Sequence, residues 1–185
     1  MEQKLKVAVI GCGGISGCHL EAYSKNPSVE IYALCDVNEK NLNRRGDQYH
    51  VERRYTNKDK MLAELPEIDA VSVCTWNAAH AECTIAALNA GKHVLCEKPM
   101  AMNAAEAQAM LDAAKRNDRL LMIGFVRRFG NDCTIAKDLI EHDRMGDIYY
   151  AKATYLRRNG CPGGWFGDKA RSGGGPLIDL GVHVI

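Results

Sequence analysis

The sequence predicts an α/β fold in which a doubly wound parallel sheet is followed by the incomplete start of a second, α+β domain. Up to about residue 125, short apolar runs alternate with longer segments of helical periodicity. Continuous apolar runs are typical of parallel strands that helices cover on both faces. Beyond residue 125 this alternation stops. We therefore place one domain at residues 1–125 and the start of another at 126–185.

The elements of the first domain are expected in strict alternation, joined by right-handed crossovers. Strands are predicted at 5–10, 30–35, 70–74, 93–96 and 120–124, and helices at 15–24, 39–49, 80–90 and 104–116.

The second part has a different pattern. We expect a helix near 133–142, a long alternating strand at 147–157 and a loop rich in glycine at 159–175. Loops of this length with little regular structure are often functional. Pro176 fits the first turn of a final helix, which places Asp179 and His183 four residues apart on one helix face. A carboxylate and an imidazole so placed can share a proton.

Composition excludes several classes of partner. The formal charge of +1 provides no basic field for nucleic acid or an anionic membrane.

No apolar signal segment or membrane-length run occurs, so we expect a cytoplasmic protein. The eight cysteines form no Cys-x-x-Cys pair, and several lie in apolar runs, so we expect reduced, mostly buried thiols. No histidine or cysteine spacing resembles a zinc site, so we expect no metal.

A glycine-rich turn between the first strand and helix predicts a diphosphate site. Gly11 permits a tight turn, Gly13 lets a pyrophosphate approach the backbone, and Gly14 and Ile15 lead into the helix N-terminus. The free N–H groups there can bind two phosphates without a lysine. Ser16 stands where a third glycine often occurs and is small enough for close packing. This is the dinucleotide pattern of a Rossmann fold.

The second predicted strand ends at Asp36, where a carboxylate can accept hydrogen bonds from an adenosine ribose. The structural alternative is that Asp36 only begins a turn or caps a helix. Because no basic residue directly follows Asp36, NAD is favoured over NADP, although Arg44 and Arg45 leave NADP as an alternative.

Polar residues also follow the next two predicted strands. In open α/β sheets ligands lie outside the carboxyl ends of the strands, so these residues face the same crevice as the glycine turn. They are Thr75, Asn77 and His80 after one strand, and Glu97 and Lys98 after the other. Each candidate catalytic residue also has a purely structural interpretation. Lys98 could be a solvated lysine in a turn, Asp179 could complement the helix dipole, and His183 could be a buried, hydrogen-bonded core residue.

Taken together, the motifs resemble the Gfo/Idh/MocA oxidoreductases. The resemblance covers residues 7–183 and depends on Gly11-Cys12-Gly13-Gly14-Ile15, Cys35-Asp36, Cys74-Thr75-Trp76-Asn77 with His80, Ala90 to Pro99, Gly124-Phe125 with Arg127-Arg128-Phe129, and Gly173-Gly174-Gly175 with Asp179 and His183. It implies an N-terminal NAD(P)-binding Rossmann domain and a larger domain that covers the substrate and builds oligomers. It also implies that Lys98, Asp179 and His183 are catalytic.

The chemistry of hydride transfer is consistent with these residue types. A nicotinamide accepts a hydride from a carbinol carbon, and the protein must supply the base for the hydroxyl proton. His183 suits the base, Asp179 can orient it, and Lys98 favours alkoxide character. The roles of Lys98 and His183 can also be exchanged.

We therefore expect an NAD-dependent dehydrogenase of a sugar, inositol or related polyol. Two alternatives stay open: an NAD-dependent glycosidase of the same superfamily, and a catalytically inactive NAD-binding module or sensor. Because partners for the strand at 147–157 are not evident, we expect an incomplete second domain, pairing into a homo-oligomer or disorder of that strand, and doubtful activity of the isolated chain.

Overall fold

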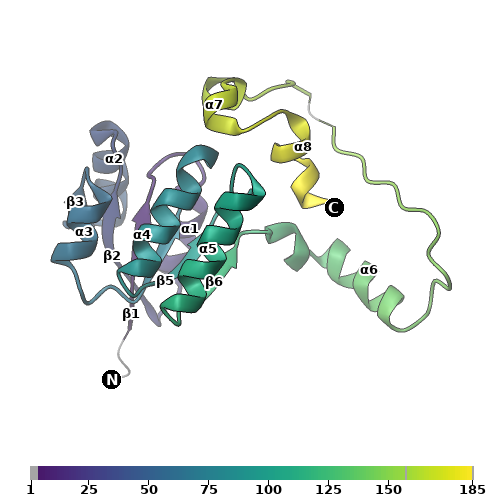
Figure 1. The fold of residues 1–185 in the computed structure, drawn as a ribbon, viewed down its shortest axis with the longest axis horizontal. Coiled ribbons are helices and arrows are strands. Elements are labelled where there is room, and N and C mark those ends of the chain that lie inside the picture. The colour runs from purple at the N-terminus through teal and green to yellow at the C-terminus, as the bar shows by residue number, and fades with distance from the viewer. Residues whose placement is uncertain (1–3, 157, 185) are drawn as a thin grey trace.

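The fold is built on one parallel sheet at the N-terminal side of the chain. The structure is a computed structural model that describes residues 4–156 and 158–184. Six parallel strands lie in the order β3-β2-β1-β4-β5-β6, which places the first strand near the middle (Figure 1). Their bounds are β1 Leu5–Ile10, β2 Val29–Cys35, β3 Arg54–Tyr55, β4 Ala70–Val73, β5 His93–Cys96 and β6 Leu121–Ile123.

Helices cover both faces of this sheet, as the doubly wound prediction requires. The helices of the first 125 residues are α1 Ser16–Lys25, α2 Glu39–Tyr49, α3 Lys58–Glu64, α4 His80–Asn89 and α5 Ala104–Arg116. Helices α3, α4 and α5 pack on one face, where Leu88 and Met110 are fully buried. Helices α1 and α2 pack on the other face around Leu20 and Leu42. The apolar strand runs are buried because both faces are covered.

Most of the predicted elements are confirmed, but β3 and α3 were missed. Two residues of strand and seven of helix are too short to produce a clear hydrophobic period. One usable signal was Asn57, whose side chain accepts hydrogen bonds from the N–H groups of Asp59 and Lys60 and so caps α3.

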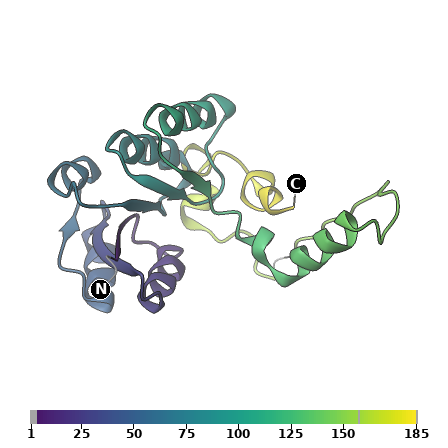
Figure 2. The same cartoon turned by 90° about the horizontal axis from the view of Figure 1, so that it is seen from below.

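The connection after β6 leaves the sheet and then returns to it. Helix α6 (Asn131–Glu141) extends away from the sheet in both views (Figures 1 and 2). The chain then returns, so that α7 (Lys169–Ser172) and α8 (Pro176–Asp179) lie beside the first domain. Contacts of α7 with the short helix η1 (Asn77–Ala79) place this segment at the carboxyl ends of the strands.

Two predictions for this second part were wrong. Residues 147–156 form no strand and are exposed, while Arg157, the last residue of the predicted strand, lies outside the described residues. A strand needs a neighbour for its N–H and C=O groups, and no described segment provides one here. The final helix is also broken: α8 ends at Asp179, and His183 lies in a separate 3-10 turn, Gly181–His183.

Across the part of the chain that the structure describes, no helix combines the length and apolar character that crossing a bilayer requires.

The contrast between the sheet core and the exposed connection can be tested with two leucines. Leu88 is fully buried and Leu156 is 88% exposed. We expect Leu88→Ala to lower the free energy of unfolding by about 2–5 kcal/mol, because it leaves a cavity. Leu156→Ala should change it by less than about 0.5 kcal/mol. Urea denaturation followed by circular dichroism measures both, and equal losses would contradict the assignment of the core.

Candidate cofactor cleft and reaction site

The glycine turn after β1 lies directly against the end of β4. Gly11 has a φ of +94°, and a Cβ at this position would lie 2.6 Å from the backbone carbonyl carbon of Cys74. Both the backbone conformation and the close approach exclude a side chain. Gly11 therefore allows the turn to cross the neighbouring strand as β1 ends.

The turn presents unused donors to open space. Among the described residues, nothing accepts a hydrogen bond from the N–H groups of Gly13, Gly14 or Ile15. A Cβ on Gly13 or Gly14 would meet no atom within 4 Å. The hydroxyl of Ser16 donates to the carbonyl of Gly13 at 2.8 Å and steadies the turn. Free N–H groups at the start of a helix fit an anionic diphosphate.

Asp36 lies beside the turn, at the end of β2. One carboxylate oxygen accepts from the N–H of Cys12 at 2.6 Å, and the other accepts from the N–H of Asn38 at 2.7 Å. Asp36 therefore begins a turn, as one interpretation held, and it also joins the glycine turn to the second strand. Each oxygen retains accepting capacity. The carboxylate thus fits a ribose diol.

Arg44 and Arg45, the two residues that left NADP as an alternative cofactor, make different contacts. Arg45 is buried and donates to the carbonyls of Gly13 and Gly14, at 3.1 and 3.3 Å. Arg44 is exposed and makes one long contact, 3.4 Å, with the carbonyl of Cys12. Arg45 is thereby bound to the protein rather than available to a 2′-phosphate, and the carboxylate of Asp36 would repel one.

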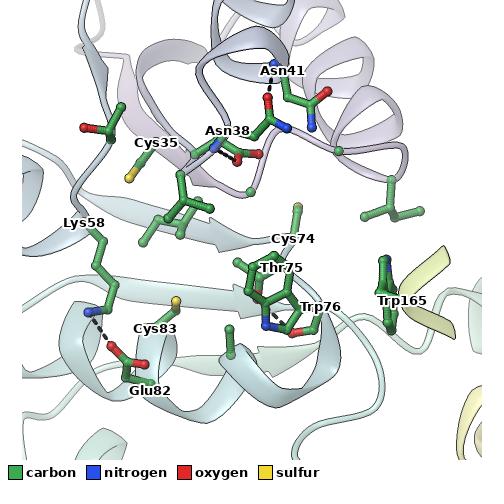
Figure 3. A pocket seen from close by; sticks show the side chains of 18 of the residues that line it. Cys35, Asn38, Asn41, Lys58, Cys74, Thr75, Trp76, Glu82, Cys83 and Trp165 are labelled. Carbon is green, nitrogen blue, oxygen red and sulfur yellow. Dashed lines mark hydrogen bonds and ion pairs between the residues drawn. The ribbon is translucent and has the colours of Figure 1, made fainter. Parts of the chain in front are cut away.

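A cavity of about 620 Å³ opens between these elements, of a size that suits a large cofactor. Gly11, Asp36 and Thr75 line it, together with Trp165 from the returning segment. Figure 3 shows Trp76 and Trp165 facing each other at one end, and Lys58 paired with Glu82 at the other. Both parts of the chain thus line the cavity.

Sequence reasoning missed several residues that line this cavity. Trp165 and Phe166 stack with ring centroids 4.0 Å apart, and the guanidinium of Arg171 lies over the ring of Trp76 at 5.4 Å. The length of the 159–175 loop indicated a functional segment, but no spacing rule located its partner. Lys58 was missed because α3 was missed.

Asn77 and His80 do not line the described cavity. Asn77 is buried, and its amide donates to the carbonyl of Ser172 at 2.7 Å. The ring of His80 is buried, with Nδ1 2.7 Å from the carbonyl of Pro99 and Nε2 3.2 Å from that of Thr75. Burial lowers the pKa of His80 despite these two hydrogen bonds. Both side chains join loops that surround the cavity.

Lys98 and Asp179 meet although 81 residues separate them. The ammonium of Lys98 lies 2.9 Å from the Asp179 carboxylate and donates to the Asp179 carbonyl at 2.8 Å. Both side chains are largely buried, at 19% and 16% exposure. The end of β5 is thereby joined to α8.

His183 lies one turn further along, close enough for the charges of Lys98 and Asp179 to act on it. Burial and the positive charge of Lys98 lower the pKa of His183, and the charge of Asp179 only partly opposes them. Its Nδ1 atom is buried and has no hydrogen-bond partner among the described residues. His183 therefore presents a neutral imidazole at pH 7, with an unused polar atom.

A second, smaller cavity of about 150 Å³ lies next to His183. Phe125, Arg127, Arg128 and Val182 complete its lining. It is separate from the larger cavity, and the lysine-aspartate pair lines neither. The site thus has a large compartment along the glycine turn and a small basic one beside the imidazole.

Glu97 is buried behind this region rather than in the cavity. Its carboxylate lies 2.8 Å from Nε2 of His19 on α1 and accepts from the N–H of Lys98 at 3.2 Å. Burial acts to raise the pKa of Glu97, but the hydrogen bond and charge of His19, with the charge of Lys98, leave it below the usual value. Glu97 fixes the backbone that carries Lys98.

The thiols near the cavity are protected from ionisation. Cys12, Cys35, Cys74, Cys83 and Cys96 are buried, and burial raises the pKa of Cys12 and of Cys35 to about 12. Cys18 and Cys161 are exposed. No group of three His, Cys, Asp or Glu residues within 4–156 and 158–184 has the geometry of a metal site.

This sheet order, the glycine turn, the free donors and the carboxylate at the end of β2 define a dinucleotide-binding Rossmann protein. Comparison with known proteins agrees. Residues 5–125 match the family described as "Oxidoreductase family, NAD-binding Rossmann fold", and residues 134–185 match the "GFO/IDH/MocA C-terminal domain". The chain belongs to the Gfo/Idh/MocA oxidoreductase family, and its first domain is an NAD-binding Rossmann domain.

Individual relatives show the same likeness. D-glucoside 3-dehydrogenase of Escherichia coli is 37% identical over 98% of this chain and 52% of its own length. Myo-inositol 2-dehydrogenase of Thermotoga maritima is 32% identical over 97% of this chain and 52% of its own. The crystal structure of an NAD-binding protein from Listeria innocua superposes with a TM-score of 0.89 at 32% identity, covering 98% of this chain and 53% of that one. The chain spans about half the length of these relatives.

Two glycines of the turn distinguish packing from ligand contact. Gly13→Ala meets no protein atom, so we expect the free energy of unfolding to change by less than about 1 kcal/mol. Its methyl group occupies the space in front of the free donors, so NAD affinity should fall at least about tenfold by calorimetry. Gly11→Ala should instead destabilise the fold itself. Unchanged NAD affinity in Gly13→Ala would contradict the diphosphate position.

The lowered pKa of Glu97 predicts a pH-dependent contribution to stability. Because its pKa is lower in the folded than in the unfolded state, the contribution is complete above the unfolded value near 4.5. It is lost as the pH falls through the lower, folded value. We expect Glu97→Gln to lower the free energy of unfolding at pH 7, and the difference from the unmodified chain to shrink below pH 4.5. Denaturant titrations across pH 3–7 measure this, and a constant difference would argue against it.

Proposed function

We propose that this chain takes part in the NAD-dependent oxidation of a secondary alcohol on a sugar, inositol or related polyol. The observation that carries the proposal is the approach of Lys98, Asp179 and His183 beside the NAD-binding edge of the sheet. We also propose the division into a cofactor domain at 1–125 and the first part of a substrate domain at 126–185.

The reaction divides into two transfers. NAD held at the glycine turn and Asp36 would supply the acceptor for the hydride that the carbinol carbon loses. The hydroxyl proton leaves to the imidazole of His183, so that a ketone, NADH and a proton are the products. Lys98 lies close enough to influence His183, and its ammonium stabilises negative charge that develops on the alcohol oxygen.

Electrostatics favour His183 as the base rather than Lys98. The ammonium of Lys98 donates to both the carboxylate and the carbonyl of Asp179, so it is placed as a donor rather than as a proton acceptor. The lowered pKa of His183 keeps its ring neutral and able to accept a proton at pH 7. Asp179 then offsets the positive charge that the imidazole gains.

The substrate class is supported by the relatives. The names of two of them specify oxidation of a D-glucoside and of myo-inositol. Both substrates carry adjacent hydroxyl groups on a six-membered ring, and we propose a substrate of this class here.

The proposal is tested by NADH formation with D-glucosides and inositols, compared between the unmodified chain, Lys98→Met and His183→Asn. We expect either substitution to lower kcat by about 10²–10⁴-fold, because a proton acceptor or a charge stabiliser is removed. NAD affinity, measured by calorimetry, should change by less than about threefold.

The other outcomes identify other functions. Release of a sugar from a glycoside without net NADH would indicate a glycosidase that uses NAD transiently. NAD binding with no turnover of any polyol, both in this chain and in a full-length version, would indicate a sensor or binding module. Full activity in Lys98→Met would contradict the assigned site.

A further inference from the structure

Arg45 on α2 is a buried cation for which the described residues provide no carboxylate partner. It is only 9% exposed, and within the described parts of the chain it forms no ion pair. Nη1 donates to the side chain of Gln48 at 2.8 Å, and Nη2 donates to two carbonyls of the glycine turn. Nε is buried and has no described hydrogen-bond partner. A buried positive charge normally has a counter-charge, and the described residues do not supply one.

The carbonyls that Arg45 holds belong to the peptides that carry the free donors. The carbonyl of Gly13 shares a peptide with the N–H of Gly14, and the carbonyl of Gly14 shares one with the N–H of Ile15. In a trans peptide these two groups point in opposite directions. Arg45 therefore fixes the carbonyl ends, while the N–H ends point away from it, and Gly14 and Ile15 line the large cavity.

We propose that Arg45 is a positioning residue of the dinucleotide site, and that its charge complements the diphosphate of the bound cofactor. It holds both peptides in the orientation that presents their N–H groups. Hydrogen bonds polarise one another along a chain, so the cationic donor behind each carbonyl strengthens the N–H in front. This inference rests on NAD binding by the first domain and not on the reaction.

Gly17 supports the same role from α1. A Cβ at residue 17 would lie 2.6 Å from Nη2 of Arg45. Alanine is otherwise preferred to glycine inside a helix. The glycine leaves the space through which the guanidinium reaches the turn.

The test compares Arg45→Met with the unmodified 185-residue chain by calorimetry. NAD and ADP-ribose contain the diphosphate, whereas adenosine does not. We expect Arg45→Met to lower the affinity for NAD and for ADP-ribose at least tenfold, and the affinity for adenosine less than threefold. Raising the salt concentration should narrow the difference between the two proteins for NAD, because part of it is electrostatic. Lys40→Met, which removes one exposed charge from the same helix, should change NAD affinity less than twofold.

Gly17→Ala provides a second test that keeps the guanidinium. Its methyl group displaces Nη2, so NAD affinity should fall at least threefold while the helix gains propensity. If Arg45→Met does not fold, Gly17→Ala decides. NAD affinity within twofold of the unmodified chain in Gly17→Ala, or within threefold in a folded Arg45→Met, overturns the proposal. An equal loss of adenosine and NAD also overturns it. Failure of the unmodified chain to bind NAD refutes the cofactor assignment instead, whereas loss of turnover alone leaves the role of Arg45 intact.

Discussion

The parallel direction of all six strands is the constraint on which the site depends. Because every strand runs the same way, the turns after β1, β2, β4 and β5 emerge at one edge of the sheet. At Gly11 the turn passes so close to the backbone of Cys74 that no side chain would fit. For this reason the free N–H donors of the glycine turn, the Asp36 carboxylate and Lys98 lie at the same edge, although they are far apart along the chain.

Two polar contacts bring the C-terminal segment to this edge. Asn77 donates to the carbonyl of Ser172, and Lys98 pairs with Asp179. Each begins at the end of a strand and reaches a residue more than 80 positions later. Ahead of the first anchor, Ser172, the same segment places Trp165 in the lining of the cavity. Residues of the first domain thus build one wall of the cavity, and the returning C-terminal segment builds another.

Sequence reasoning located what depends on local pattern. Continuous apolar strands, the glycine turn and the residues at strand ends follow from periodicity and backbone conformation, so their positions were predicted. The unpaired segment at 147–156 was predicted as a strand because alternation indicates a strand whether or not a neighbour exists. Trp165 and Arg45 were not assigned to their contacts, because a stacking ring or a buried guanidinium depends on which loops meet, and no spacing specifies that.

The distribution of thiols gives the molecule a built-in reporter of opening. Five cysteines are buried, three of them in the walls of the large cavity, whereas Cys18 and Cys161 are exposed. A thiol reacts as its thiolate, and burial holds the pKa of Cys35 near 12 and that of Cys83 near 11. In the closed fold an alkylating reagent modifies the exposed pair first. The rate at which the buried thiols follow then measures how often the cofactor domain opens, without any engineered label.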